Sequence, residues 1–245
     1  IKQKIIKINE INAEIILYKV DIDRTKYCHF FLPEIKNFVD SNKLNNIKDE
    51  MLKINPTIAE DFDAKRQKGQ NDNYLSSLIQ EDAIDEFVEY VNKKCISNNS
   101  LITHSIFETN SFLIENQPSL IEYAAFFGSI QIFQYLRFNN VEMKHSLWLY
   151  AIHGNNPEII HLLEENQVEL EDEKYEKCFL ESIKCHSKNI SSYIMNNKLN
   201  PNNYSDHFKE DVISYSFRYY NYSYFPNNFD NNFGFFYSCV YNYSK

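Results

Sequence analysis

The chain has 245 residues, of which 43% are hydrophobic and 24% charged, and its formal net charge at pH 7 is −9. The apolar content excludes wholesale disorder, and the negative charge leaves no basic surface for nucleic acid or for an anionic membrane. With only 4 glycines and 6 prolines, the composition favours helices joined by short loops. The longest apolar run, Phe233–Tyr241, is too short to span a bilayer, so we expect no membrane partner.

The five cysteines are scattered and odd in number, and no secretion signal opens the chain. Free thiols in a cytoplasmic, reducing compartment are therefore expected. The cysteines are Cys28, Cys95, Cys178, Cys185 and Cys239.

Residues 1–72 are expected to form an N-terminal helical region. Ile1–Asp23 predicts an amphipathic helix, because apolar residues recur in steps of three and four along it. This stripe is too short to indicate a coiled coil. Packing against the following helices and self-association both remain open. The stripe consists of Ile8, Ile11, Ile15, Tyr18 and Ile22.

Three further helices are predicted before residue 72, at Pro33–Val39, Leu44–Ile54 and Pro56–Lys68. The last has Pro56 at its first position and Gly69 after a basic final turn, both typical of helix ends. The polar link from Gln70 to Asn73 is the best candidate in the chain for a boundary between domains.

Residues 119–163 contain the same pattern twice. Ala124 is followed by Gly128 and then by an apolar pair, and Ala151 is followed at identical spacings by Asn155 and another apolar pair. A small residue, a tight turn and an apolar pair predict a helical hairpin, and its repetition predicts a solenoid. Looser copies begin at Ile79, Ser182 and Ile213.

These copies assign residues 73–213 to helical repeats, with helix pairs near 74–92, 119–138, 146–165 and 177–196. An extra helix is predicted at Thr103–Glu115. Ser119 with Glu122 forms the S-x-x-E capping box of one first helix, and Ser146 is the equivalent N-cap in the next unit.

The segment SLIEYAAFFGSIQIFQYL, which begins at Ser119, resembles an ankyrin repeat, and SLWLYAIHGNNPEIIHLL, from Ser146, resembles a second. From about Asn73 to Leu199 the chain also resembles a protist-expanded family of ankyrin-like proteins of unknown function. The resemblance implies an all-α stack of antiparallel hairpins whose first helices line a protein-binding surface. The unit is shorter than the usual ~33 residues, and the missing part falls at Arg137–Lys144, where ankyrin repeats carry a projecting finger.

The tail, residues 214–245, is rich in Tyr, Phe, Asn and Ser and carries few charges. We interpret it as a degenerate last repeat or as a poorly ordered segment.

Motifs for chemistry are scarce. Cys178, Cys185 and His186 are close in sequence, but the chain has no CxxC pair and no fourth ligand to make a zinc site with them. Phosphate-binding glycine loops and the GxSxG elbow are also missing from the sequence. We therefore expect no catalytic activity, no cofactor and no metal.

The sequence favours a protein–protein interaction module, an ankyrin-like scaffold or adaptor with an unidentified protein partner. The expected binding residues lie on the outer face of the first helices. Packing of Tyr123 and Tyr150 between units is the competing interpretation. A structural oligomer assembled through Ile1–Asp23 and an enzyme with no visible motif are the alternatives. The expected binding residues are Glu122, Tyr123, Phe126, Tyr150 and His153.

Overall fold

The computed structural model describes residues 8–19, 28–54, 56–58, 60–170, 172–200, 204–224, 236 and 240. These residues form helices joined by turns and loops, and the only β-type pairing among them is an isolated bridge between Leu101 and Ser119. The all-α prediction is therefore confirmed for this part of the chain. None of its helices combines the length and the apolar character needed to cross a membrane.

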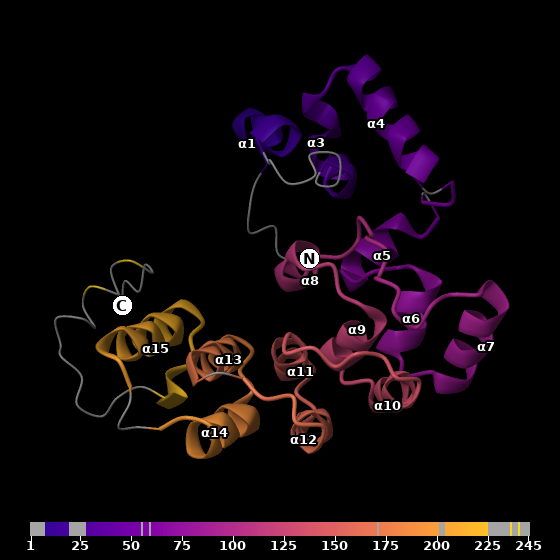
Figure 1. The fold of residues 1–245 in the computed structure, drawn as a ribbon. Helices are drawn as coiled ribbons and strands as arrows, with labels where there is room; N and C mark the ends of the chain where they lie inside the picture. The colour runs from indigo at the N-terminus through magenta and orange to yellow at the C-terminus, as the bar shows by residue number, and fades with distance from the viewer. Residues whose placement is uncertain are drawn as a thin grey trace. The chain divides into compact units, whose positions relative to one another are not determined.

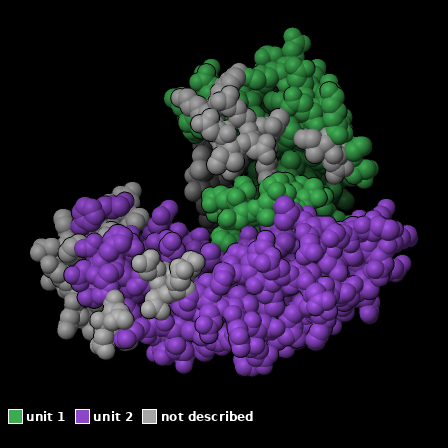
Figure 2. Space-filling view, in the orientation of Figure 1, with its two compact units in different colours: residues 1–77, 102–117 green, residues 78–101, 118–245 purple. Residues whose placement is uncertain are grey.

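The chain divides into two compact units, coloured separately in Figure 2. Unit 1 contains residues 1–77 and 102–117, and unit 2 contains residues 78–101 and 118–245. The division differs from the predicted regions in two ways. The segment 102–117 belongs with unit 1 rather than with the repeats, and residue 214, the predicted start of the tail, lies inside helix α15 (Asp206–Arg218).

Unit 1 is built from short helices around one core cluster, to which Ala13, Ile35, Met51 and Phe107 belong. The α1 helix covers only Glu10–Glu14 and continues as a π-helical turn. In this helix Ile11 is exposed and Ala13 is buried, while Ile8 just before it packs against the core, so only part of the predicted isoleucine stripe forms the packed face. The ends of the predicted Ile1–Asp23 helix lie outside the described residues. The helices are α1, α3 (Leu32–Ile35), α4 (Ser41–Ile54), α5 (Phe62–Lys68) and α8 (Ser111–Glu115).

Two of the predicted N-terminal elements are shorter than expected. The α5 helix begins only at Phe62, because Asp61 before it has a left-handed φ of 54° and Pro56 lies in a separate turn. Gly69 ends this helix with a φ of 63°, as its position predicts. In the predicted helix Thr103–Glu115, only the last turn is helical.

Hydrogen bonds explain why residues 102–117 join unit 1. The Asn71 amide donates to the Thr103 carbonyl (2.7 Å), and the Ser105 hydroxyl donates to the Asp72 carboxylate (2.7 Å). The Thr109 hydroxyl adds a bond to the carbonyl of Gly69 (2.8 Å). These bonds satisfy polar groups in a segment that lacks regular helix, which fixes it beside the end of α5.

Unit 2 contains the predicted helix pairs, in chain order (Figure 1). Each pair joins a first helix to a second helix through a turn of two or three residues. The α6 helix straddles the boundary between the units, and α15 follows the pairs without a partner helix of its own. The pairs are α6 (Tyr74–Gln80) with α7 (Ile84–Lys94), α9 (Leu120–Phe127) with α10 (Ile130–Phe138), α11 (Leu147–Gly154) with α12 (Pro157–Glu165), and α13 (Asp172–Lys184) with α14 (Lys188–Asn197).

The turn after each first helix has a left-handed residue at the same place. The sequence predicts this conformation at Gly128 and Asn155, which tolerate it best. Three other turns place less suited residues there, so their register was harder to predict. The five residues are Asp82 (φ 50°), Gly128 (70°), Asn155 (47°), His186 (56°) and Tyr220 (56°).

The first helices pack side by side in the order α9, α11, α13, α15, and the second helices α7, α10 and α12 pack in a parallel series (Figure 1). Ala124 and Ala151 lie in the interior of this arrangement with no exposed surface. Their small side chains allow neighbouring first helices to approach closely, as the repeated pattern predicts.

After four of the five left-handed turn residues, all except Asp82, the next residue donates a side-chain hydrogen bond to a backbone carbonyl of the preceding hairpin. We call these the inter-hairpin hydrogen bonds. Three of the acceptor carbonyls lie three residues before a left-handed residue, and the fourth, Gly128, is the left-handed residue itself. The bonds fix each hairpin against the one before it. They run from Ser129 Oγ to Ile79 (2.5 Å), from Asn156 Nδ2 to Gly128 (3.0 Å), from Ser187 Oγ to Ile152 (3.2 Å) and from Asn221 Nδ2 to Ile183 (2.8 Å).

Gly154 marks the closest backbone approach between two hairpins. A Cβ atom added to it would lie 2.1 Å from the Ala125 carbonyl oxygen and 2.9 Å from the Gly128 nitrogen. Both are backbone atoms, which cannot move aside as a flexible side chain could. A glycine is therefore required at this place, although it lies in a helix.

The substitution Gly154→Ala tests this contact. Alanine is favoured over glycine inside a helix by about 1 kcal/mol, but here overpacking should dominate and destabilise the protein by about 1–3 kcal/mol in urea unfolding. Asn196→Ala, on the exposed face of α14, is the matched control and should leave stability unchanged or slightly raised. A Gly154→Ala protein as stable as wild type would contradict the close approach.

Candidate functional site on the first helices

The residues two positions before the left-handed turns lie at the carboxyl ends of successive first helices. We call them the first-helix row: Phe126, His153, Lys184 and Arg218. The first three are only partly exposed, the side chain of His153 by 10%, and Arg218 is exposed. Because the helices that carry them pack in sequence, the row is the part of unit 2 where equivalent side chains reach solvent from adjacent hairpins.

Two of the five expected binding residues do not face outward. Tyr123 and Tyr150 are 1% and 5% exposed. Their burial agrees with the competing interpretation, in which they pack between neighbouring hairpins. The Gln80 amide donates to the Tyr123 hydroxyl (2.9 Å). Burial raises the pKa of Tyr150 above its usual range, and the nearby charge of Glu122 adds to the effect. Sequence reasoning left both interpretations open because first-helix periodicity alone does not show how closely the next helix approaches.

Glu122 has a structural role. Its carboxylate accepts hydrogen bonds from the backbone N–H and the hydroxyl of Ser119, both at 2.8 Å, which confirms the predicted pairing of these two residues. Its other oxygen accepts from the Ser146 hydroxyl (2.6 Å). Ser146 stands at the N-cap position of α11, as predicted, but it has helical backbone angles and its side chain makes no cap bond to its own helix. Glu122 therefore links α9 to the start of α11.

Phe126 and His153 remain on the accessible side. Their rings stack with centroids 4.8 Å apart and planes inclined by 24°. Phe126 covers one face of the imidazole and limits its rotation. The pair joins the carboxyl ends of α9 and α11.

His153 also contacts Glu181 in α13 and Cys185 directly after it. Its Nε2 atom lies 2.8 Å from Glu181 Oε1, and its Nδ1 atom lies 3.3 Å from the Cys185 sulfur. An ionised carboxylate only accepts, so we assign the Nε2–H as donor to Glu181 and the Cys185 S–H as donor to Nδ1. The Lys184 ammonium donates to the same carboxylate oxygen at 2.8 Å.

The electrostatics of this group follow from burial and neighbouring charge. Burial alone would raise the pKa of Glu181, but hydrogen bonds from His153 and Lys184 outweigh it and hold the pKa below its usual value. Burial raises the pKa of the Cys185 thiol to about 12; the Glu181 charge adds to the shift and Lys184 opposes it. At neutral pH the group therefore holds a carboxylate and a protonated thiol.

We call His153, Glu181 and Cys185 the His–Glu–Cys cluster. One potential ligand atom from each lies within 4.8 Å of the others, and all three side chains are zinc ligands in proteins. The order thiol, imidazole, carboxylate is also that of a nucleophile, a base and its orienting group, but the thiol here is not ionised. The cluster can donate protons, accept them or bind a cation.

Sequence reasoning missed this cluster because its members come from different hairpins. Of the three residues that the sequence brought together, Cys185 belongs to the cluster, whereas Cys178 is buried and His186 is exposed in the turn. One signal was available: Glu181 and Cys185 are four residues apart, so they share a helix face. Only the packing of α11 on α13 places His153 against that face.

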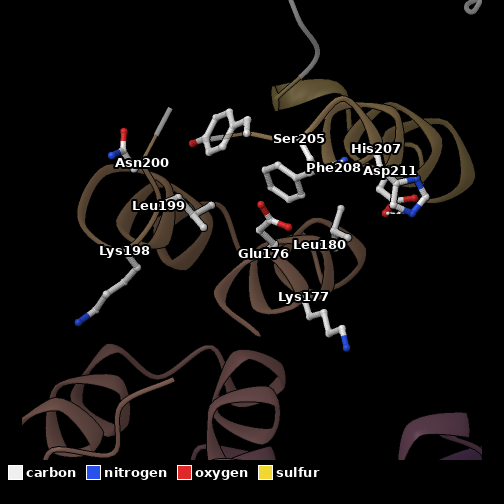
Figure 3. A pocket seen from close by; sticks show the side chains of 11 residues that line it. Glu176, Lys177, Leu180, Lys198, Leu199, Asn200, Ser205, His207, Phe208 and Asp211 are labelled. Carbon is white, nitrogen blue, oxygen red and sulfur yellow. Dashed lines mark hydrogen bonds and ion pairs between the residues drawn. The ribbon is translucent and has the colours of Figure 1, made fainter. Parts of the chain in front are cut away.

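A pocket of about 610 Å³ lies between α13, α14 and α15 (Figure 3). Glu176, Leu180 and Phe208 point into it, while the ammonium groups of Lys177 and Lys198 point away (Figure 3). A second pocket of about 520 Å³ lies within unit 1, between α3, α4 and α5. Neither pocket is lined by the His–Glu–Cys cluster.

Comparisons of the chain with protein-family models, with curated proteins and with solved structures find no match.

Alkylation rates test the electrostatics of the cluster. With a chelator present at pH 8, Cys185 should react with iodoacetamide at least about tenfold more slowly than the exposed Cys95, because the thiolate is the nucleophile. Glu181→Gln removes a negative charge that opposes ionisation, so it should speed the reaction of Cys185 and leave Cys95 unchanged. Peptide mass spectrometry reads both sites in one sample. Equal rates at Cys185 and Cys95 in the wild type would contradict the protonated, half-buried thiol.

Proposed function

We propose that unit 2 is an ankyrin-like helical solenoid that binds another protein through the first-helix row. The observation that carries the proposal is the row itself, in which equivalent side chains of successive hairpins reach solvent on a scaffold fixed by the inter-hairpin hydrogen bonds. A rigid, extended surface of this kind suits a protein partner, because little order has to be gained on binding.

The side chains of the row indicate what kind of partner segment it would bind. Phe126 and His153 offer stacked aromatic rings at one end, and aromatic residues are enriched where protein interfaces are most strongly bound. Arg218 places an exposed positive charge at the other end of the row, whereas the Lys184 ammonium is paired with Glu181. We infer a partner segment with an apolar anchor followed by acidic residues, whose charges would mainly speed the encounter.

Self-association through the N-terminal helix is the second candidate. Its support is the exposure of Ile11 and Ile15 on the described part of the helix, 68% and 40%. The mass of the protein in solution separates the two candidates: a dimer that Ile11→Lys converts to a monomer would favour self-association.

Affinity capture from the source cell tests the proposed row. Phe126→Arg should lose the partners that the wild type recovers, because it removes the aromatic anchor and places a charge there. Phe138→Arg is the matched control, because Phe138 is an exposed aromatic residue at the end of a second helix, α10. The Phe138→Arg protein should recover the same partners as the wild type. Far-UV circular dichroism should confirm that both variants are folded. If Phe126→Arg recovers the same proteins as the wild type, the row is not the interface.

A further inference from the structure

We propose that His153, Glu181 and Cys185 form a zinc site that joins α11 to α13. The inference does not depend on the proposed protein-binding role. Its first support is the donor set. Thiolate, imidazole and carboxylate together select zinc over calcium or magnesium, which prefer oxygen ligands alone.

The spacing of the donors is close to that of a bound ion. With Zn–S and Zn–N distances of about 2.3 and 2.0–2.1 Å, ligand atoms around a tetrahedral zinc lie about 3.3–3.6 Å apart. The sulfur–Nδ1 distance is 3.3 Å and the Nε2–Oε1 distance is 2.8 Å. Because these contacts use opposite nitrogens of one ring, the ion requires the Glu181 carboxylate or the imidazole to rotate.

The surroundings hold the donors in place. The Ser187 hydroxyl, two residues after Cys185, bonds to the Ile152 carbonyl beside His153 (3.2 Å), so the two helix ends are fixed to one another. Phe126 stacks on the imidazole and restricts it. Lys184 occupies Glu181 Oε1, which makes its ammonium the cation that an incoming ion must displace.

Binding is coupled to one proton transfer. The Zn–S bond forms as the Cys185 thiol releases its proton to solvent, while His153 binds as the neutral ring and Glu181 as the carboxylate. Three protein ligands leave the fourth position for water, as in open zinc sites. We therefore expect an exchangeable ion whose affinity rises with pH, rather than a closed structural centre.

Cobalt(II) is the probe, because its absorption spectrum reports its ligands. Titration of the full, chelator-treated chain with cobalt(II) alone should produce a thiolate-to-cobalt charge-transfer band, which zinc(II) then removes. Cys185→Ser should abolish the band. Glu181→Gln and His153→Gln should weaken cobalt binding by at least about tenfold. Cys95→Ser, which alters an exposed thiol outside the cluster, should leave the titration unchanged.

Lys184→Met sharpens the test. Removing the competing ammonium should tighten cobalt binding severalfold, whereas a cluster held only by its own hydrogen bonds predicts no such gain. Circular dichroism before each titration confirms that the variants are folded; if Cys185→Ser does not fold, the affinities of Glu181→Gln and His153→Gln decide the matter. No charge-transfer band in the wild type, a band that survives Cys185→Ser, or unchanged affinity in both other ligand variants would overturn the proposal.

Discussion

The arrangement of unit 2 depends on the contact between the turn of one hairpin and the first helix of the hairpin before it. A side chain placed directly after the left-handed residue donates to a carbonyl of the preceding hairpin at four turns, those of Gly128, Asn155, His186 and Tyr220. At the junction of α9 and α11, the missing side chain of Gly154 lets backbone approach backbone. Buried polar groups need such partners, so these bonds specify one register between hairpins where apolar packing alone would allow several.

The same closeness decides which first-helix residues are available to a partner. Helices that approach this tightly bury what lies between them, including Tyr123 and Tyr150. Side chains at the carboxyl ends of the helices stay partly exposed, because there the chain turns away from the neighbouring first helix. His153 lies at such an end, and the short distance from α11 to α13 brings it within hydrogen-bond range of Glu181. The first-helix row and the His–Glu–Cys cluster thus both follow from the short distance between neighbouring first helices.

Local signals in the sequence were enough to predict the helices of unit 2. Ala124 with Gly128, and Ala151 with Asn155, carry the small residue and the turn residue that a hairpin requires. Features that depend on contacts between residues far apart in the sequence could not be predicted. Tyr220 is not a residue that predicts a left-handed turn, so the sequence places the register of the last first helix, expected from Ile213, three residues early. The contact of the segment 102–117 with residues 69–72 likewise rests on hydrogen bonds that carry no local pattern.

His153 belongs to both proposals, and this links them thermodynamically. An ion at the cluster would fix the imidazole, and the imidazole supports the ring of Phe126 at the proposed interface. A partner that prefers that fixed arrangement would bind more tightly to the zinc-loaded chain, and by linkage zinc would then bind more tightly to the complex by the same factor. The displaced ammonium of Lys184 adds a second connection, because it lies in the row and would be released from Glu181. The coupling therefore needs no change of fold, only the rearrangement of side chains at one helix junction.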